Sequence, residues 1–197
     1  MERNVNFGTE GLSDIAVHLA WAQLEIFADD VEKIQVMAAG DENSVSDLRI
    51  EVKDGTLLVE QPQYGLSLNI MESKWLQVCV RVPRAWGHGI HCSTLSGLLS
   101  ARKLNGSEIV LETVTGDLRA LKLSAAQMSL KSVSGDTRGE ELKAEKLNMR
   151  SVSGDAALDA LSTKTLKCNS VSGEQTYNMN SSFERVDVTA VYGNVII

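Results

Sequence analysis

The sequence predicts an all-β protein whose C-terminal half is a single-stranded parallel β-solenoid built from 19-residue coils. One five-residue motif recurs at a spacing of 19 residues, and apolar and polar residues alternate with period two before each copy. Aromatic residues make up only 5% of the chain, which suits thin stacked layers better than a thick globular centre. A 19-residue unit cannot bury its apolar positions alone, so stacking in register is the arrangement that gives it a core.

The repeat is marked by a glycine that follows Ser-Val-Ser or a close variant of it. The copies read TLSGL, TVTGD, SVSGD, SVSGD, SVSGE and AVYGN, with glycines at Gly97, Gly116, Gly135, Gly154, Gly173 and Gly193. Successive glycines are 19 residues apart four times and 20 residues apart once. We expect each glycine to lie at a bend between two faces of a coil, in the positive-φ conformation that glycine adopts without steric cost.

Alignment of the coils on this glycine collects apolar residues into four columns. They stand seven, five and two positions before the glycine and seven after it, as Ile109, Leu111, Val114 and Leu123 do in one coil. Mostly polar residues separate the first two columns, so one face of the strand is buried and the other is wet. In register, the members of a column form a ladder with rungs about 4.8 Å apart. We expect the four ladders to form a continuous core.

The first half of the chain lacks the repeat. Residues 21–92 are expected to form a β-rich cap on a solenoid at 93–197, in one continuous domain, and residues 1–20 to form a poorly ordered segment with at most a short helical turn. Five segments read as strands, at 21–27, 33–38, 48–52, 56–60 and 75–82. Asp54-Gly55, between two of them, is a strong signal for a two-residue hairpin. A cap is needed because an open coil exposes unpaired backbone groups.

These features resemble one known family. The S-V-S-G-D repeat, the Asp54-Gly55 hairpin, the strand at 76–82 and the PRAWG turn from Pro83 are similar to the bacterial "putative adhesin" domain family, the DUF4097-like β-strand-repeat proteins. The resemblance covers residues 24–197. It implies a right-handed single-stranded β-helix in proteins that are often exported or membrane-linked, and it brings no catalytic residues.

Composition restricts the partners and the compartment. The net charge of −7 argues against nucleic acid, which needs clustered Lys and Arg, and against an electrostatic hold on anionic membranes. No apolar stretch approaches the roughly 20 residues of a membrane span, and no signal peptide is visible. Cys79, Cys92 and Cys168 show no disulfide framework and fit free thiols in a reducing compartment. A cytoplasmic protein is expected, although a chain trimmed of an anchor would look the same and would be membrane-associated or exported.

An acidic residue follows the glycine in four successive coils, at Asp117, Asp136, Asp155 and Glu174. In register these carboxylates would stack about 5 Å apart, where like charges repel, so something must relieve them. The functional interpretation is a cation site or a general acid–base row. The preferred, structural interpretation is that each carboxylate bonds the turn backbone, while solvent and the nearby Arg119 and Arg138 offset the charge.

A second group contains potential metal ligands. His88, His91 and Cys92 form an H-x-x-H-C run, Cys79 lies in the preceding predicted strand, and zinc takes such ligands. Cys92 stands in the same inward column as Leu111, however, which predicts a core position. No Ser-His-Asp order, phosphate-binding loop or dinucleotide fingerprint is present, so we predict no catalytic residue, no resident metal and no cofactor.

These observations predict a non-enzymatic, adhesin-like scaffold or interaction module. Two alternatives stay open, because fold alone does not decide function. A carbohydrate-active or metal-assisted enzyme would use the stacked acidic column. A cytoplasmic filament former of the bactofilin type would share the β-helix, although its coils are shorter than 19 residues.

The last residues, Ala190 to Ile197, read AVYGNVII and are β-prone and nearly uncharged. No polar cap follows them, and the unpaired backbone groups of a terminal coil recruit other strands. We expect a second molecule to cover this end, giving a homodimer joined near the C-terminal coils by strand pairing or apolar contact. The alternative is a monomer in which Ile196 and Ile197 tuck into the core of the solenoid.

Overall fold

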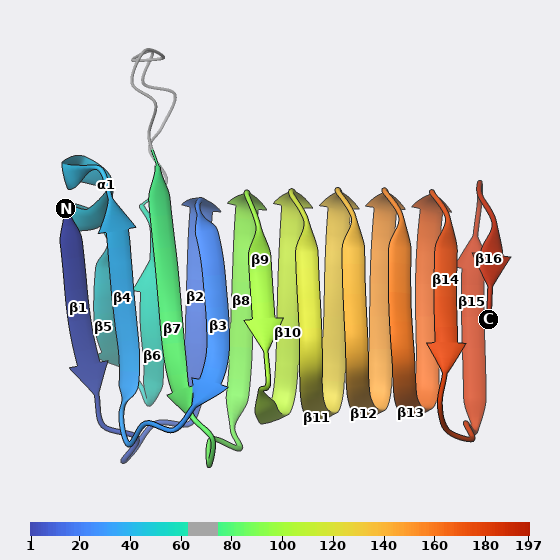
Figure 1. The fold of residues 1–197 in the computed structure, drawn as a ribbon, viewed down its shortest axis with the longest axis horizontal. Coiled ribbons are helices and arrows are strands. Elements are labelled where there is room, and N and C mark those ends of the chain that lie inside the picture. Colours follow the sequence, from blue (N-terminus) through green and yellow to red (C-terminus); the bar gives the residue numbers. More distant parts are fainter. Residues whose placement is uncertain (63–74) are drawn as a thin grey trace.

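The chain forms an elongated stack of β-strands, which confirms the predicted all-β solenoid (Figure 1). The computed structural model describes residues 1–62 and 75–197. The first elements are β1 (Glu2–Phe7), β2 (Asp14–Trp21), β3 (Gln23–Asp29), β4 (Ile34–Gly40), α1 (Glu42–Ser46), β5 (Arg49–Lys53), β6 (Thr56–Glu60) and β7 (Leu76–Pro83). The others are β8 (Gly89–Ser96), β9 (Leu99–Arg102), β10 (Asn105–Thr115), β11 (Leu118–Ser134), β12 (Thr137–Ser153), β13 (Ala156–Ser172), β14 (Gln175–Met179), β15 (Arg185–Ala190) and β16 (Val195–Ile196). Across the described ranges, no helix has the length and apolar character needed to cross a bilayer.

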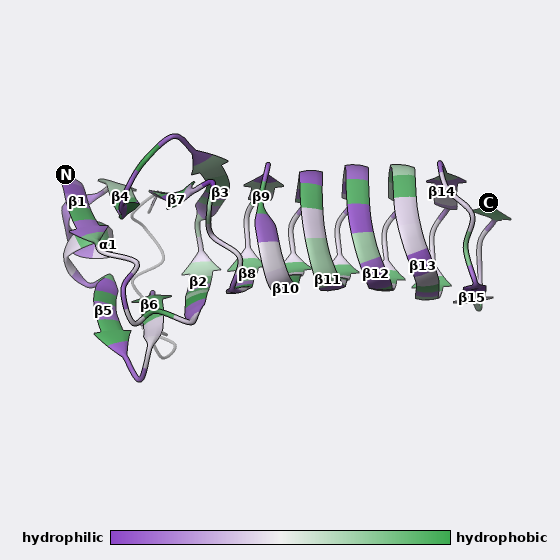
Figure 2. Ribbon diagram, turned by 90° about the horizontal axis from the view of Figure 1, so that it is seen from below, coloured by the Kyte–Doolittle hydropathy of each residue, from purple (hydrophilic) through white to green (hydrophobic). Residues whose placement is uncertain are grey.

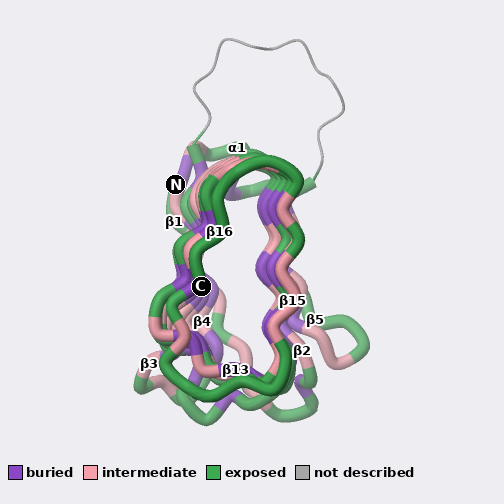
Figure 3. The backbone as a smooth tube through the Cα atoms, turned by 90° about the vertical axis from the view of Figure 1, so that its right-hand side faces the viewer, coloured by how far each residue is buried: buried purple, intermediate pink, exposed green. Residues whose placement is uncertain are grey.

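The coils stack into two facing walls of parallel strands, which are seen end-on in Figure 3. Wall 1 contains β2, β8, β10, β15 and the second parts of β11, β12 and β13. Wall 2 contains β3, β9, β14, β16 and the first parts of the same three strands. Ile109 pairs with Ile90 on one side and with Met128 on the other, so register is kept from coil to coil. Each coil therefore adds one rung, about 4.8 Å along the axis, to every ladder.

Three of the four predicted apolar columns form the core. Ile109 and Leu111 are fully buried and Leu123 is 1% exposed, and the same holds for their counterparts from β8 to β13. On wall 1 the buried alternation continues with hydroxyl side chains, at Thr94, Thr113, Ser132, Ser151 and Ser170. Two of these hydroxyls donate across the bend to the carbonyl of the glycine three residues on, Thr113 at 3.3 Å and Ser132 at 3.2 Å.

The fourth column is expected in the core but lies on the surface. This valine ladder consists of Leu95, Val114, Val133, Val152, Val171 and Val191, which are between 38% and 61% exposed. The cause is the parity of the strand, because successive side chains point to opposite faces and the residue after buried Thr113 must point outward. An unbroken apolar row therefore runs along the outside of the solenoid.

The glycine column is confirmed as a bend, and close stacking of the coils gives a second reason for glycine. Gly135 and Gly154 have φ of 126° and 121°, in the region that favours glycine. A Cβ on Gly154 would lie 2.3 Å from the carbonyl oxygen of Gly135, far inside van der Waals contact. Backbone conformation and neighbouring backbone thus both exclude a side chain here.

One more coil, which the repeat analysis does not find, precedes the first copy of the motif. β2 pairs in parallel with β8, and β3 pairs in parallel with β9, so residues 14–29 continue both walls. Ile15 stacks on Ile90, and Ala22 occupies the glycine position under Gly97. Residues 1–20, which are expected to be poorly ordered, instead contain β1 and most of β2. The solenoid therefore begins before residue 93.

Antiparallel strand pairs close the N-terminal end. β6 and β7 lie parallel to β2 and β3, and β5, β4 and β1 then add antiparallel strands outside them. The predicted hairpin is confirmed, since Asp54 and Gly55 join β5 to β6 with positive φ of 49° and 78°. In Figure 2 this hairpin projects from the N-terminal end, whereas the coils from β8 to β13 form a regular row. The strands expected at 33–38, 48–52, 56–60 and 75–82 correspond to β4, β5, β6 and β7.

Candidate functional site

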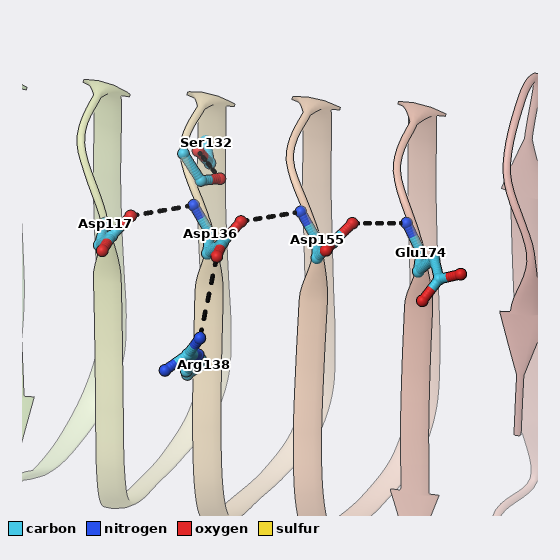
Figure 4. Close-up of polar contacts among 7 residues, drawn as sticks. Asp117, Ser132, Asp136, Arg138, Asp155 and Glu174 are labelled. Atoms are coloured by element: carbon cyan, nitrogen blue, oxygen red, sulfur yellow. Dashed lines mark hydrogen bonds and ion pairs between the residues drawn. The ribbon is translucent and has the colours of Figure 1, made fainter.

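The acidic residues after the glycines form a continuous row at the start of wall 2 (Figure 4). Asp117 accepts a hydrogen bond from the backbone N–H of Asp136 at 3.1 Å, and Asp136 accepts one from Asp155 at 3.2 Å. Asp155 in turn accepts one from the backbone N–H of Glu174 at 2.8 Å. The structure thus brings the four predicted candidates together and links them along the solenoid axis.

This geometry accounts for an acid in four successive coils without a ligand. Each Asp carboxylate binds the backbone N–H of the next coil, which satisfies a donor at a tight bend and places a positive dipole end against the negative charge. A guanidinium nitrogen of Arg138 lies 3.9 Å from a carboxylate oxygen of Asp136 and adds an electrostatic attraction that solvent partly screens. The row ends at Glu174, because Asn194 occupies the equivalent position in the last coil. The structural interpretation of the row therefore rests on three observed hydrogen bonds.

The histidines of the second candidate group do not converge. His91 points outward from wall 1, where its Nε2 lies 3.9 Å from a carboxylate oxygen of Asp14 and 3.9 Å from one of Glu108. His88 lies in the turn before β8 and packs edge-on against Trp86, with ring centroids 5.1 Å apart. Within residues 1–62 and 75–197, no three His, Cys, Asp or Glu side chains are placed to hold a metal ion.

All three cysteines are free, and burial governs their chemistry. Desolvation raises the pKa of Cys92 to about 12 and that of Cys168 to about 11. Cys79, on β7, is partly buried, and desolvation raises its pKa as well. The thiolate is the form that attacks electrophiles and binds metals, so these thiols suit neither role at neutral pH.

The outer face of wall 2 carries a groove that the apolar columns do not predict. It encloses about 590 Å³ beside the acidic row, and its lining includes Gln23, Arg119, Arg138, Glu140 and Asp159. Arg119 and Arg138 are direct neighbours in register, three positions after their glycines, in a column that an apolar alignment passes over. Cations and carboxylates both line the groove, so it does not favour ligands of one charge sign.

The last coil leaves apolar side chains uncovered. Val191, Tyr192, Ile196 and Ile197 are 61%, 72%, 61% and 59% exposed, so the expectation that the two isoleucines could tuck into the core is wrong. Among the described strands, β15 pairs with β13 alone and β16 with β14 alone, so each keeps one open edge. Tyr177, on β14, fills the C-terminal end of the core. It is 1% exposed, and its hydroxyl donates a hydrogen bond to the side-chain oxygen of buried Gln175 at 2.8 Å.

One protein family matches almost the whole chain. The sequence matches the Toastrack DUF4097 family over residues 12–197, which includes the additional N-terminal coil. The chain belongs to this family. The Toastrack match agrees with the resemblance that the repeat and its lead-in carry. None of the curated proteins matches the chain.

Solved structures from several bacteria share this architecture. The crystal structure of a "putative adhesin" from Bacteroides fragilis has a TM-score of 0.62 at 15% identity and covers 100% of this chain and 97% of that chain. A "putative cell adhesion protein" from Clostridium sporogenes has a TM-score of 0.49 at 17% identity, with 100% and 98% covered. A "putative lipid binding protein" from Parabacteroides distasonis has a TM-score of 0.45 at 14% identity, with 100% and 96% covered. At these identities the likeness to the Bacteroides protein establishes the fold alone.

Proposed function

We propose that the protein is a non-enzymatic scaffold whose C-terminal end binds a second copy of the same chain. The observation that carries the proposal is the uncovered last coil, where exposed apolar side chains surround two open strand edges. Open edges recruit further strands, and clustered apolar surface favours association. The similar structure from Bacteroides fragilis is described as a "putative adhesin", which agrees with a binding role.

The two ends of the molecule support a closed dimer over a filament. A two-fold axis perpendicular to the solenoid lets the same residues, such as Tyr192 and Ile196, meet on both copies, so the contact is self-complementary and closes. β15 or β16 of one copy then extends the sheet of the other as an antiparallel neighbour. A filament would need a complementary surface at the N-terminal end, which instead presents antiparallel strands with Arg49, Glu51 and Lys53 along β5.

The oligomeric state tests this contact directly. Light scattering at micromolar concentration is expected to give a dimer mass for the wild type and a monomer mass for Ile196→Ser combined with Ile197→Ser. Val133→Ser combined with Val152→Ser is the matched control, because it also replaces two exposed aliphatic residues but lies away from the last coil. That control is expected to remain dimeric. A wild-type monomer whose mass the isoleucine pair does not change would overturn the proposal, and long polymers in negative-stain micrographs would favour the filament.

The acidic row supports a non-enzymatic role. Its aspartates accept hydrogen bonds from the backbone of the bends, and the described residues include no group of three His, Cys, Asp or Glu side chains that could hold a metal ion. We expect neither the wild type nor the Asp117→Asn, Asp136→Asn, Asp155→Asn triple variant to cleave polysaccharides in a reducing-sugar assay. Cleavage by the wild type that the triple variant loses would establish the enzyme instead.

We propose that the scaffold is cytoplasmic. Three free cysteines, two of them in the core, support a reducing compartment, because oxidising compartments favour disulfides. Fractionation of the native cells, with detection by antibody, tests this placement. Recovery of the protein in the membrane or secreted fraction would contradict it.

A further inference from the structure

The outer face of wall 1 carries a group of cations that neither the acidic row nor the end contact explains. Nine outward positions on β11, β12 and β13 form three rows of three in register. We call them the cationic array, after the four cations Lys131, Lys146, Arg150 and Lys167. None of the nine is acidic, although the chain as a whole has a net charge of −7. These nine positions therefore carry four cations and no acid, although Glu112 on β10 and Asp187 on β15 flank them in register.

The register holds these charges close together. Lys131 and Arg150 are direct neighbours on β11 and β12. Lys167 is the neighbour of Asn148, which stands between Lys146 and Arg150 along β12. With strands about 4.8 Å apart and same-face residues about 6.6 Å apart, the four cations fall within a patch of roughly 10 by 13 Å.

Most of these charges have no counter-charge. Lys131 forms an ion pair with Glu112, which lies outside the array on β10. The side chains of Lys146, Arg150 and Lys167 are exposed and make no hydrogen bond or ion pair with any residue that the structure describes. Asp187 is the neighbour of Lys167 in register on β15, but it forms its ion pair with Arg185. Like charges on neighbouring strands raise the energy of the sheet, and an anion bound across them would relieve the repulsion.

We propose that the cationic array binds an acidic polysaccharide. The array is a flat stretch of sheet, which fits an extended polymer that crosses several strands better than a small ion that needs an enclosed pocket. Its five neutral members are amides and hydroxyls, at Gln127, Ser129, Asn148, Thr165 and Asn169. These groups can exchange hydrogen bonds with sugar hydroxyls while the cations bind carboxylates.

Two other polyanions fit the array less well. Single-stranded nucleic acid depends on aromatic side chains for base stacking, and the array contains none. An anionic membrane would engage the valine ladder, since Val133 and Val152 border the array on one side. The acidic row, however, lies just across the bend from those valines, so docking them would press carboxylates against anionic headgroups.

Titration calorimetry of the full chain with polygalacturonate tests the proposal, at low salt and at about 0.15 M salt. The array variant combines Lys146→Gln, Arg150→Gln and Lys167→Gln. A matched variant makes the same chemical changes at exposed cations elsewhere, with Lys33→Gln, Lys53→Gln and Arg119→Gln. We expect the array variant to lose about tenfold in affinity and the matched variant to lose less than about twofold. Binding is expected to weaken at the higher salt, and neutral dextran is expected not to bind.

Several results would overturn the proposal. Polygalacturonate that fails to bind the wild type at low salt would do so, as would equal losses in the two triple variants. Tighter binding to phosphatidylglycerol vesicles, or to a single-stranded oligonucleotide, than to polygalacturonate would show that the class of ligand is wrong. If the triple array variant does not fold, Lys146→Gln and Lys167→Gln are measured singly, and each is expected to weaken binding about two- to threefold.

Discussion

The two ends of the solenoid finish the same architecture in different ways. At the N-terminal end, the parallel strands β6 and β7 are followed by antiparallel β5, β4 and β1, and charged residues alternate along β5. At the C-terminal end the last strands, β15 and β16, keep the parallel direction of the coils and expose apolar residues. Charged residues along an edge strand oppose further pairing, whereas an apolar edge offers another strand a template. This contrast is the reason for proposing that association occurs at the C-terminal end.

The largest expected difference concerns two isoleucines, one at each end of the solenoid. Ile26, in the N-terminal coil, is fully buried, whereas Ile196 is 61% exposed. We expect Ile26→Ala to lower the free energy of unfolding by about 2–5 kcal/mol, through lost burial and the cavity left behind. Ile196→Ala is expected to cost less than about 0.5 kcal/mol in the monomer. Urea denaturation at low protein concentration measures both, and similar losses would mean that the two ends are equally well covered.

The first coil differs from the later ones at the glycine position, where it has Ala22. Gly154→Ala places a Cβ 2.3 Å from the carbonyl oxygen of Gly135 at a φ of 121°, so we expect a loss on the order of 3 kcal/mol. Ala22 already carries a Cβ at the same position, and Ala22→Gly is expected to cost only about 0.5–1 kcal/mol. Thermal unfolding of the two variants provides the measurement. A Gly154→Ala protein as stable as the wild type would refute the close-stacking explanation.

Two tyrosines near the C-terminal end test what closes the core there. Tyr177→Phe leaves the buried side-chain oxygen of Gln175 without its donor, so we expect a loss of about 1–2 kcal/mol. Tyr192 is 72% exposed, and Tyr192→Phe is expected to change the free energy of unfolding by less than about 0.5 kcal/mol. Denaturant curves for the pair decide the point. If both variants matched the wild type, the internal hydrogen bond would contribute nothing to closing the core.

The smallest perturbation is chemical labelling, which leaves the fold unchanged. Desolvation raises the pKa of all three thiols, least completely at the partly buried Cys79, while Cys168 has a pKa of about 11 and hence roughly one thiolate per thousand molecules at pH 8. We expect a small alkylating reagent to modify Cys79 first. Its rate should rise about tenfold per pH unit below the pKa. Mass spectrometry after timed quenching reads the order, and native-state labelling of Cys168 at the rate of Cys79 would show that the last coil opens readily.

The sequence predicts the coils at the positions where backbone contact or burial requires the same type of residue in every repeat. The glycine spacing and the columns through Ile109 and Leu111 repeat because backbone contact and burial impose them on every coil. The same reasoning misplaced Val114, because it weighed hydrophobicity above the strict alternation that had already assigned Leu111 to the interior. A strand was predicted at 21–27, but the coil formed by residues 14–29 was missed, because Ala22 replaces the glycine and the alternation of Ile15, Val17 and Leu19 is the remaining signal.

The candidate sites show a similar division. Stacking of Asp117, Asp136 and Asp155 follows from the repeat, and so does the preference for backbone partners. The cationic array does not follow from the repeat, because its four cations occupy three different columns and are scattered in sequence among Ser, Asn and Gln. It becomes visible when the outward residues of three neighbouring strands are placed in register. The net charge of −7 does not reveal the cationic array, because acidic residues elsewhere in the chain outnumber the cations.

β2 and β3 each lie between two strands from later in the chain, and this placement affects how the protein folds. During synthesis these strands emerge early, yet β2 must wait on one side for β6 and on the other for β8, which are much later in the chain. By contrast, β11, β12 and β13 each find a partner one repeat back, so they can add in turn once a first coil exists. Loop closure over long separations is slow, whereas nearest-neighbour addition is fast. We therefore expect pairing of the N-terminal strands to limit the rate of folding. The later coils then add one after another, each in register with the coil before it.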